Sequence, residues 1–306
     1  SAEAQAEAQV LMLAANHILA PKDGKPIIVP TQDMVLGTYY MTRIKKDAKG
    51  TGRVFTGIEE ALLAYQQGDI ELQAEIYARL RKESLPEHLQ EEITDKFVLV
   101  KTSVGRMIFN EELPANLRYF RKDSEGKWTL GIVMNKKELG KLVAECFTEC
   151  GATKTAEVID NVKKLGYHYA CLAGITVAVS DVIVPGEKKD IIEDTAGKVN
   201  KVERQFARGL MTEEERYKKV VDLWTKATDD VADAMMQNLE EKNPFNPIYM
   251  MSDSGARGNK QQMRQLAGMR GLMADPSGKI IDLPITANFR EGLSVSDYFI
   301  SSHGAR

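Results

Sequence analysis

The sequence feature that most constrains this fold is a pair of apolar stripes with helical spacing, between about residues 188 and 239. The first stripe runs up to a break at Gly209 and consists of Ile192, Val199, Val202, Phe206 and Leu210. The second consists of Tyr217, Val220, Val221, Trp224, Val231 and Met235. Between them, Thr212-Glu213-Glu214-Glu215 has the pattern of a capping box, in which the Thr hydroxyl and the Glu carboxylate satisfy amides that a first helical turn leaves unpaired. Two long helices joined by so short a turn predict an antiparallel hairpin with a charged, solvated outer surface.

The rest of the chain mixes helix and strand signals. Helices are expected at residues 1–20 and 59–67, and another is expected to begin after Thr31 as its N-cap. Two more helices are expected between residues 136 and 165, separated by a break at Gly151. Strands are expected at residues 76–80 and 97–101, and a buried strand or loop at residues 173–179. We therefore predict an α+β, helix-dominated fold, with a mixed α/β region followed by the long hairpin.

Composition excludes several classes of protein. With 306 residues, 43% of them hydrophobic, the chain is long enough for a sizeable core and is not a disordered chain. Its net charge of −3 disfavours a protein that grips nucleic acid over its whole surface, although a local basic patch stays possible. Three cysteines, no long apolar run and no signal-peptide pattern lead us to expect a cytoplasmic protein without a membrane span.

Signatures of metal and nucleotide sites are absent from the sequence. Cys146 and Cys150 form one pair at helical spacing, without a second pair or a nearby histidine, so we predict no zinc site. The four histidines are scattered, no Gly-Lys pair precedes Ser or Thr, and no D-x-D-x-D cluster occurs. The chain alone does not resemble a complete enzyme.

The segment DSGARGNK, at residues 253–260, is more informative. Its small residues let a ligand approach the backbone closely, while the guanidinium of Arg257 offers paired donors to a phosphate or carboxylate. From Asp253 onward the basic residues are Arg257, Lys260, Arg264, Arg270, Lys279, Arg290 and Arg306, against the acidic Asp253, Asp275, Asp282, Glu291 and Asp297. This mildly positive tail is a candidate for anion binding; the alternative is a turn with a structural arginine.

Longer runs of this sequence are similar to a known family. Residues 246–258 read NPIYMMSDSGARG, residues 265–273 read QLAGMRGLM, residues 284–293 read PITANFREGL, and residues 303–306 read HGAR. Earlier runs include TSVGRMIFNE at residues 102–111 and GLMTEEERY at residues 209–217. Together they resemble the bacterial DNA-directed RNA polymerase β′ subunit over essentially the whole chain, least strongly at residues 83–96 and 115–135.

The resemblance implies a middle segment of that subunit. Residues 1–185 resemble the pore domain (1–10 trailing the catalytic barrel), residues 186–275 the funnel with the DSGARG loop, and residues 276–306 a truncated start of the bridge helix. In the family, the magnesium-binding motif NADFDGD precedes this segment, and the zinc elements and trigger loop lie elsewhere. We therefore expect no cofactor bound by this chain, no catalytic residue in it and no activity of the chain alone, whereas the complete enzyme, a nucleotidyltransferase, uses magnesium and zinc.

The resemblance also implies partners and roles. The partners are the β, α, ω and sigma subunits, nucleoside triphosphates, DNA template and RNA, and transcript-cleavage factors that enter the secondary channel. Arg257 matches a family residue that contacts the nucleotide triphosphate; the expected supports of the active centre are Gln265, Gly268, Arg270, His303 and Arg306. A rival hypothesis is a stand-alone helical scaffold or factor-docking module, which a native reading frame from Ser1 to Arg306 would favour. A third, an independent nucleotide-binding enzyme, requires triphosphate affinity in the isolated chain.

Overall fold

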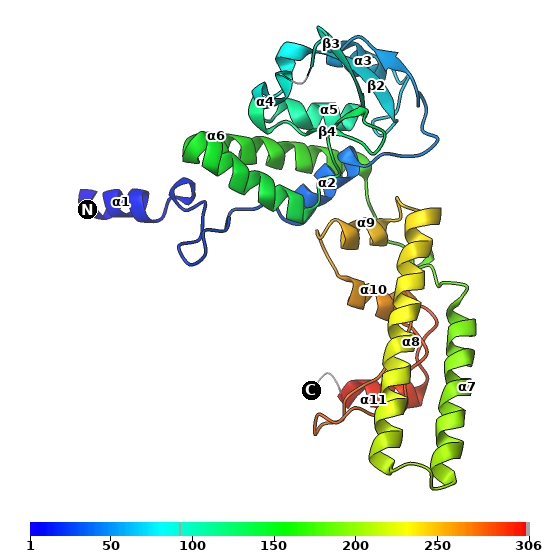
Figure 1. The fold of residues 1–306 in the computed structure, drawn as a ribbon. Coiled ribbons are helices and arrows are strands. Elements are labelled where there is room, and N and C mark those ends of the chain that lie inside the picture. The colour runs from blue at the N-terminus through cyan, green and yellow to red at the C-terminus, as the bar shows by residue number, and fades with distance from the viewer. Residues whose placement is uncertain (92, 304–306) are drawn as a thin grey trace. The chain divides into compact units, whose positions relative to one another are not determined.

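The computed structural model describes residues 1–91 and 93–303 and confirms an α+β, helix-dominated fold (Figure 1). The chain divides into two compact units. Unit 1 comprises Ser1–Ile175 together with Ser254–Ala256, and unit 2 comprises Thr176–Asp253 and the chain from Arg257 onward. The expected divisions after residues 185 and 275 stay predictions.

Unit 1 combines a small mixed sheet with helices. Its helices are α1 (Ala2–Leu11), α2 (Asp33–Thr42), α3 (Ile58–Gln66), α4 (Glu87–Gln90), α5 (Val104–Glu111) and α6 (Lys136–Ala173). Its strands are β1 (Val54–Phe55), β2 (Ile76–Arg81), β3 (Phe97–Thr102), β4 (Phe120–Lys122) and β5 (Trp128–Leu130), in the order β1-β2-β3-β5-β4. The β1–β2 and β3–β5 pairs are parallel, and the β2–β3 and β4–β5 pairs are antiparallel.

Most elements predicted for unit 1 are confirmed, including α3, β2, β3 and the break in α6, where Gly151 has a φ of 74°. The N-terminal helix is shorter than predicted. It ends at Leu11, because nothing in the described structure buries its residues, and the side chains of Asn16 and His17 contact carbonyls of its last turn. The Thr31 cap is also wrong: the cap residue is Gln32, which makes no side-chain capping bond.

Glycines bring the helices of unit 1 into backbone contact. A Cβ atom on Gly37 of α2 would overlap the carbonyl of Gly166 in α6, and one on Gly105 of α5 would overlap the carbonyl of Met41. Arg106 ties α5 to α2 further, since its Nε donates to the Thr42 carbonyl at 2.7 Å. Burial lowers the pKa of this guanidinium to about 10, against an opposing effect of Glu75.

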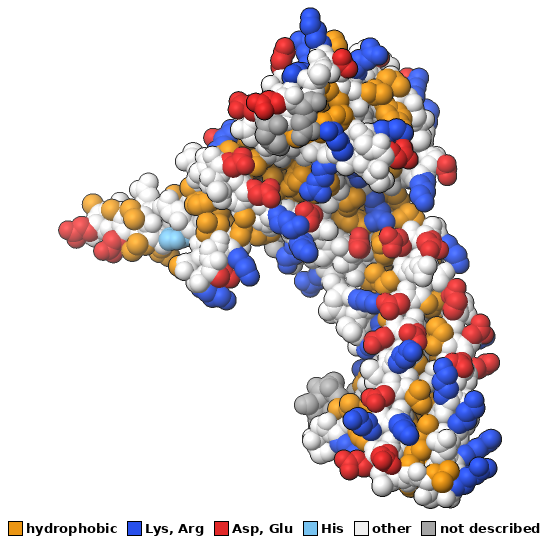
Figure 2. Space-filling model, viewed as in Figure 1, with side chains coloured by type: hydrophobic (Ala, Val, Ile, Leu, Met, Phe, Trp, Pro, Cys, Tyr) orange, Lys and Arg blue, Asp and Glu red, His pale blue; other side chains and the backbone are white. Residues whose placement is uncertain are grey.

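Unit 2 is built around the predicted hairpin of α7 (Lys188–Ala207) and α8 (Glu213–Lys242), whose antiparallel helices appear in Figure 1. The capping box is present, with Thr212 and Glu215 exchanging hydrogen bonds. The remaining helices are α9 (Pro247–Asp253), α10 (Lys260–Ala267), α11 (Val295–His303) and the 3-10 turn η4 (Val179–Asp181). Figure 2 shows charged side chains of both signs on the visible face of the hairpin, as predicted.

The predicted apolar stripe of α8 forms the core of unit 2. Val220, Trp224 and Val231 pack with Met269 and with partly buried residues of α7. Nearer the C-terminal end of the same helix, Met235 and Leu239 pack with Tyr249 of α9 and Met263 of α10. Two details differ from the prediction: Leu210 is exposed in the turn, and the segment predicted as a buried strand or loop is an exposed loop at residues 176–178 that leads into η4.

Candidate functional site

A short connection between α9 and α10 positions Arg257. Before α9, the Asn246 side chain accepts hydrogen bonds from the amides of Ile248 and Tyr249, which fixes the start of the helix. After it, the Arg257 amide donates to the Met251 carbonyl at 3.1 Å. Gly258 follows with a φ of 82°, a conformation that favours glycine, and Asn259 then caps α10. The backbone on both sides of Arg257 is therefore held in place.

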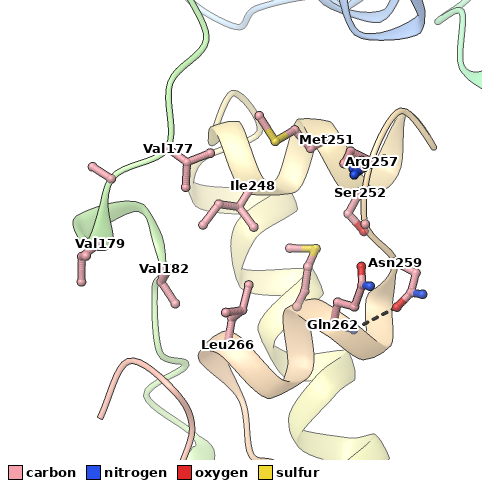
Figure 3. A pocket seen from close by; sticks show the side chains of 13 residues that line it. Val177, Val179, Val182, Ile248, Met251, Ser252, Arg257, Asn259, Gln262 and Leu266 are labelled. Carbon is pink, nitrogen blue, oxygen red and sulfur yellow. Dashed lines mark hydrogen bonds between the residues drawn. The ribbon is translucent and has the colours of Figure 1, made fainter. Parts of the chain in front are cut away.

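Arg257 lies beside a cavity of about 680 Å³ within unit 2. Figure 3 shows that its walls come from the residue 177–182 segment, from Ile248 and Met251 of α9, and from Gln262 and Leu266 of α10. Most of these walls are apolar, with polar groups on Ser252, Asn259 and Gln262. Among the described residues that line the cavity, Arg257 alone is charged.

Four of the other basic side chains described in the C-terminal segment have contacts within the chain. Lys260 pairs with Asp233, and Arg290 donates to the Val182 carbonyl. Arg270 lies over the Phe289 ring at 5.0 Å, and Lys279 lies over the Tyr217 ring at 5.0 Å. Arg264 is half-buried, and burial lowers its pKa while Asp229 opposes the shift. Arg257 is exposed and, within the described chain, its side chain has no hydrogen-bond or ion-pair partner.

The predicted support residues Gln265, Gly268 and Arg270 lie at the end of α10 and in the strand-like segment after it. The Gln265 carbonyl accepts from the Phe289 amide at 3.1 Å, and the Arg270 amide donates to the Ala287 carbonyl at 3.1 Å. A Cβ on Gly268 would lie 2.9 Å from the Arg264 carbonyl and 3.3 Å from Val231 of α8. These contacts place the three residues beside α8 and residues 287–289.

Sequence reasoning missed the residue that holds this packing together. Asn288 is fully buried, and its side-chain amide donates to the carbonyls of Ala267 and Gly268, both at 3.0 Å. Its side-chain oxygen accepts from the Glu291 amide, while the Glu291 carboxylate accepts from the Asn288 amide and from the buried Lys188 ammonium at 2.5 Å. The sequence signal was available, because Asn followed three residues later by Glu is a reciprocal capping pattern.

The remaining predicted site residues are not brought to Arg257 by any described contact. His303 is the last residue of α11, and Arg306 lies outside the described residues. Within residues 1–91 and 93–303, no group of three or more His, Cys, Asp or Glu side chains is arranged to hold a metal ion. Over the same residues, every helix is too short or too polar to cross a membrane.

Comparisons with known proteins agree along the chain. The family model of RNA polymerase Rpb1, domain 3, matches residues 17–182, and that of RNA polymerase Rpb1, domain 4, matches residues 211–290. The DNA-directed RNA polymerase subunit beta′ of Clostridium tetani is 51% identical over 100% of this chain and 26% of its own length. Those of Clostridium botulinum (strain Langeland) and Clostridium acetobutylicum are each 50% identical over 100% of this chain and 25% of their own length. The chain thus spans about a quarter of the length of these relatives.

Proposed function

This chain belongs to the RNA polymerase Rpb1 family, and we propose that it lines the secondary channel of a DNA-directed RNA polymerase and supports its active centre. The family matches and the identity to β′ subunits support the proposal. The reaction proposed for the complete enzyme is nucleotidyl transfer, in which the RNA 3′ hydroxyl attacks the α-phosphate of a nucleoside triphosphate. The β, α, ω and sigma subunits, the DNA template, RNA and transcript-cleavage factors are its proposed partners.

Within this proposal, Arg257 binds the triphosphate of the incoming nucleotide. The observation that carries the assignment is that Arg257 is exposed, unpartnered and on a fixed backbone, whereas Lys260, Arg270, Lys279 and Arg290 have contacts and Arg264 is half-buried. A free guanidinium offers paired donors to phosphate oxygens and keeps its charge at every physiological pH. It would therefore guide and orient the substrate.

Two metal ions supply Lewis-acid stabilisation in the two-metal mechanism of such enzymes. Within the described residues of this chain, no group of three His, Cys, Asp or Glu side chains is arranged to hold such ions. We therefore assign to this chain the binding and orientation of substrate and the packing of the active centre, and assign the metal ligands to the rest of the enzyme.

The segment from Gln265 to Met273 is proposed to act through packing alone. Its glycines and Asn288 fix it against α8 and residues 285–289, and none of these contacts involves the Arg257 side chain. Its substitutions are therefore expected to change elongation or pausing more than nucleotide binding. One kinetic experiment can therefore distinguish nucleotide binding by Arg257 from the packing role of the segment from Gln265 to Met273.

The test measures nucleotide addition by the assembled polymerase. We expect Arg257→Ala to raise the apparent KM for nucleotides by about tenfold to a hundredfold, the cost of losing hydrogen bonds to a charged group. The apparent KM of Arg257→Lys should lie between those of the parent and of Arg257→Ala, because an ammonium keeps the charge but loses the paired donors. Arg208→Ala, an exposed arginine at the hairpin turn, is the matched control, and Gly268→Ala should slow elongation with little change in KM. Unchanged KM for Arg257→Ala would reject the role of Arg257, and a KM effect of Gly268→Ala without an elongation effect would reject the packing role.

A further inference from the structure

The sheet of unit 1 has one face in the core and one face in solvent. Along β3, the buried Val98 and Val100 alternate with Phe97 and Leu99, each of which is 50% exposed. The buried positions join the core cluster together with Phe55, Ala78 and Leu130 of the other strands. In Figure 2, hydrophobic and basic side chains lie next to one another over the part of unit 1 where Figure 1 labels β2 and β3.

The strand register places an apolar track on the solvent face. Paired residues share a face, so Val54, Tyr77, Lys101, Thr129 and Arg121 form one row across all five strands. In the following rows, Arg79 lies opposite Leu99 and Arg81 lies opposite Phe97. The outer track therefore runs diagonally through Val54, Tyr77, Leu99 and Phe97, with Lys101 and Arg121 on one side and Arg79 and Arg81 on the other.

The cations beside the outer track are mostly free. Lys101 pairs with Glu75 at 3.0 Å. In the described part of the chain, the side chains of Arg79, Arg81 and Arg121 have no hydrogen-bond or ion-pair partner. The strands contain no carboxylate. The carboxylates of the β4–β5 turn are occupied, since Asp123 accepts backbone amides and Glu125 pairs with Lys127.

The spacing of the outer track suits separated bases. Two residues along a strand, or a diagonal between strands, correspond to a step of about 7 Å. This is about twice the 3.4 Å repeat of one strand in a duplex, so a polynucleotide on the track would have its bases apart from each other and against protein side chains. Aromatic rings that carry bases, with cations on the backbone, are the usual basis of single-strand binding.

We propose that this outer sheet face binds single-stranded RNA, with bases stacked on Tyr77 and Phe97 and phosphates held by Arg79, Arg81 and Arg121. The choice of RNA rests on the proposed function, because RNA is the polymer that such an enzyme releases as a single strand. An acidic protein segment added as an extra strand fits less well. The edge strands β1 and β4 have only two and three residues, which leaves few backbone groups for pairing.

The test measures binding of a fluorescent oligouridine of about 15 nucleotides to the 306-residue chain by anisotropy. Loss of one stacking ring in Phe97→Ala should weaken binding by about fivefold to a hundredfold. The double variant Arg79→Ala/Arg81→Ala should weaken it and reduce the salt slope, between about 50 and 200 mM salt, by about 0.7 per arginine. Arg208→Ala, an exposed arginine of unit 2, is the matched control and should bind as the parent does.

The remaining arms separate the competing explanations. Equal thermal unfolding of the variants and the parent shows that the face, and not the fold, is changed. Oligothymidine that binds as tightly as oligouridine overturns the choice of RNA, and polyglutamate that competes equally well, with Phe97→Ala unaffected, shows an acidic-protein surface instead. If no RNA binds while Arg257→Ala still raises the KM of the polymerase, this inference fails and the proposed function stands. If Arg257→Ala leaves the KM of the polymerase unchanged while RNA binding depends on the outer track, the proposed role of Arg257 fails and RNA binding by the sheet face stands.

Discussion

The two units bury their helices in different ways. In unit 1, α2 touches α5 and α6 through glycines, so that backbone meets backbone without side chains between them. In unit 2, a single apolar stripe on α8 is supplemented by polar contacts, among them buried Asn288 and the Lys188–Glu291 pair. Both units contain helices with the same apolar periodicity. The stability of unit 1 should nevertheless depend on the absence of side-chain volume at its glycines, and that of unit 2 on its polar contacts.

One arginine from each unit shows the same difference. Arg106 of unit 1 donates to the carbonyls of Thr42 and Gly131, and burial lowers its pKa. Arg216 of unit 2 pairs with three carboxylates, on Glu203, Glu213 and Asp282, and the bond to Glu213 is the main cause that raises its pKa. We therefore expect added volume to damage unit 1 most, and lost polar groups or low pH to affect unit 2.

The largest expected effect is that of Gly37→Ala in unit 1. The added methyl group would overlap the Gly166 carbonyl, which is backbone and has no rotamer to change, so α2 must move away from α6. We expect the free energy of unfolding to fall by at least about 3 kcal/mol. Urea denaturation monitored by Trp128, in a Trp224→Phe background, measures this in unit 1.

The matched control is Gly140→Ala, on α6 itself. A Cβ at Gly140 meets only Val29 at 4.0 Å, and alanine favours a helix by up to about 1 kcal/mol over glycine. Gly140→Ala should therefore leave unit 1 as stable as before or slightly more stable. If both substitutions act alike, close backbone contact does not hold unit 1, and the comparison between the units is broken.

The next largest effect is that of Asn288→Ala in unit 2. The substitution removes the hydrogen-bond donor of the buried Ala267 and Gly268 carbonyls. A buried polar group without a partner costs about 1 to 3 kcal/mol of stability. Denaturation monitored by Trp224 in a Trp128→Phe background should show a loss of about 2 kcal/mol. Asn200→Ala, at an exposed position of α7, should show none. Equal stability of Asn288→Ala and the parent would mean that packing on α8 alone holds this segment.

The elements that the sequence predicted best are those whose own periodicity determines them. The α7–α8 hairpin, with its capping box, and the strands β2 and β3 follow from local patterns. The N-terminal helix was predicted too long because composition alone favours helix there, while the actual end depends on Asn16 and His17. The loop at residues 176–178 has a strand-like composition but lies exposed, which only tertiary context decides.

The candidate site was predicted in part. Arg257 was found from its glycine-flanked setting, but its lack of a partner follows only from where the other cations lie. The sequence placed positive character in the C-terminal segment, where Lys260, Arg270, Lys279 and Arg290 in fact contact a carboxylate, a carbonyl or an aromatic ring. The free cations Arg79, Arg81 and Arg121 are far apart in sequence, and only the strand register brings them to one face. Register between distant strands is not contained in the pattern of any one strand.

The smallest expected effect tests the charge dependence of unit 2. The Glu213 carboxylate accepts from Arg216 at 2.6 Å and 3.2 Å, and this bond lowers its pKa from the ordinary value of 4.5. Because the folded state holds the carboxylate deprotonated, the pair stabilises unit 2 above about pH 4.5 and loses this contribution as pH falls through the folded pKa. Glu213→Gln should therefore be less stable than the parent near neutral pH, and this difference should shrink as pH falls through the folded pKa of Glu213.

Glu214→Gln separates this ion pair from the helix dipole. Glu214 stands in the same first turn of α8 and is exposed, so removing its charge costs the same favourable interaction with the helix N-terminus but no bond to Arg216. The free energy of unfolding is measured in urea by Trp224 fluorescence. If Glu213→Gln loses more of it than Glu214→Gln does, and the loss depends on pH, the difference is due to the bond with Arg216. Equal losses of unfolding free energy would show that solvent screens the Glu213–Arg216 pair, as it often does for exposed ion pairs. Polar contacts would then stabilise unit 2 only where they are buried, as at Asn288.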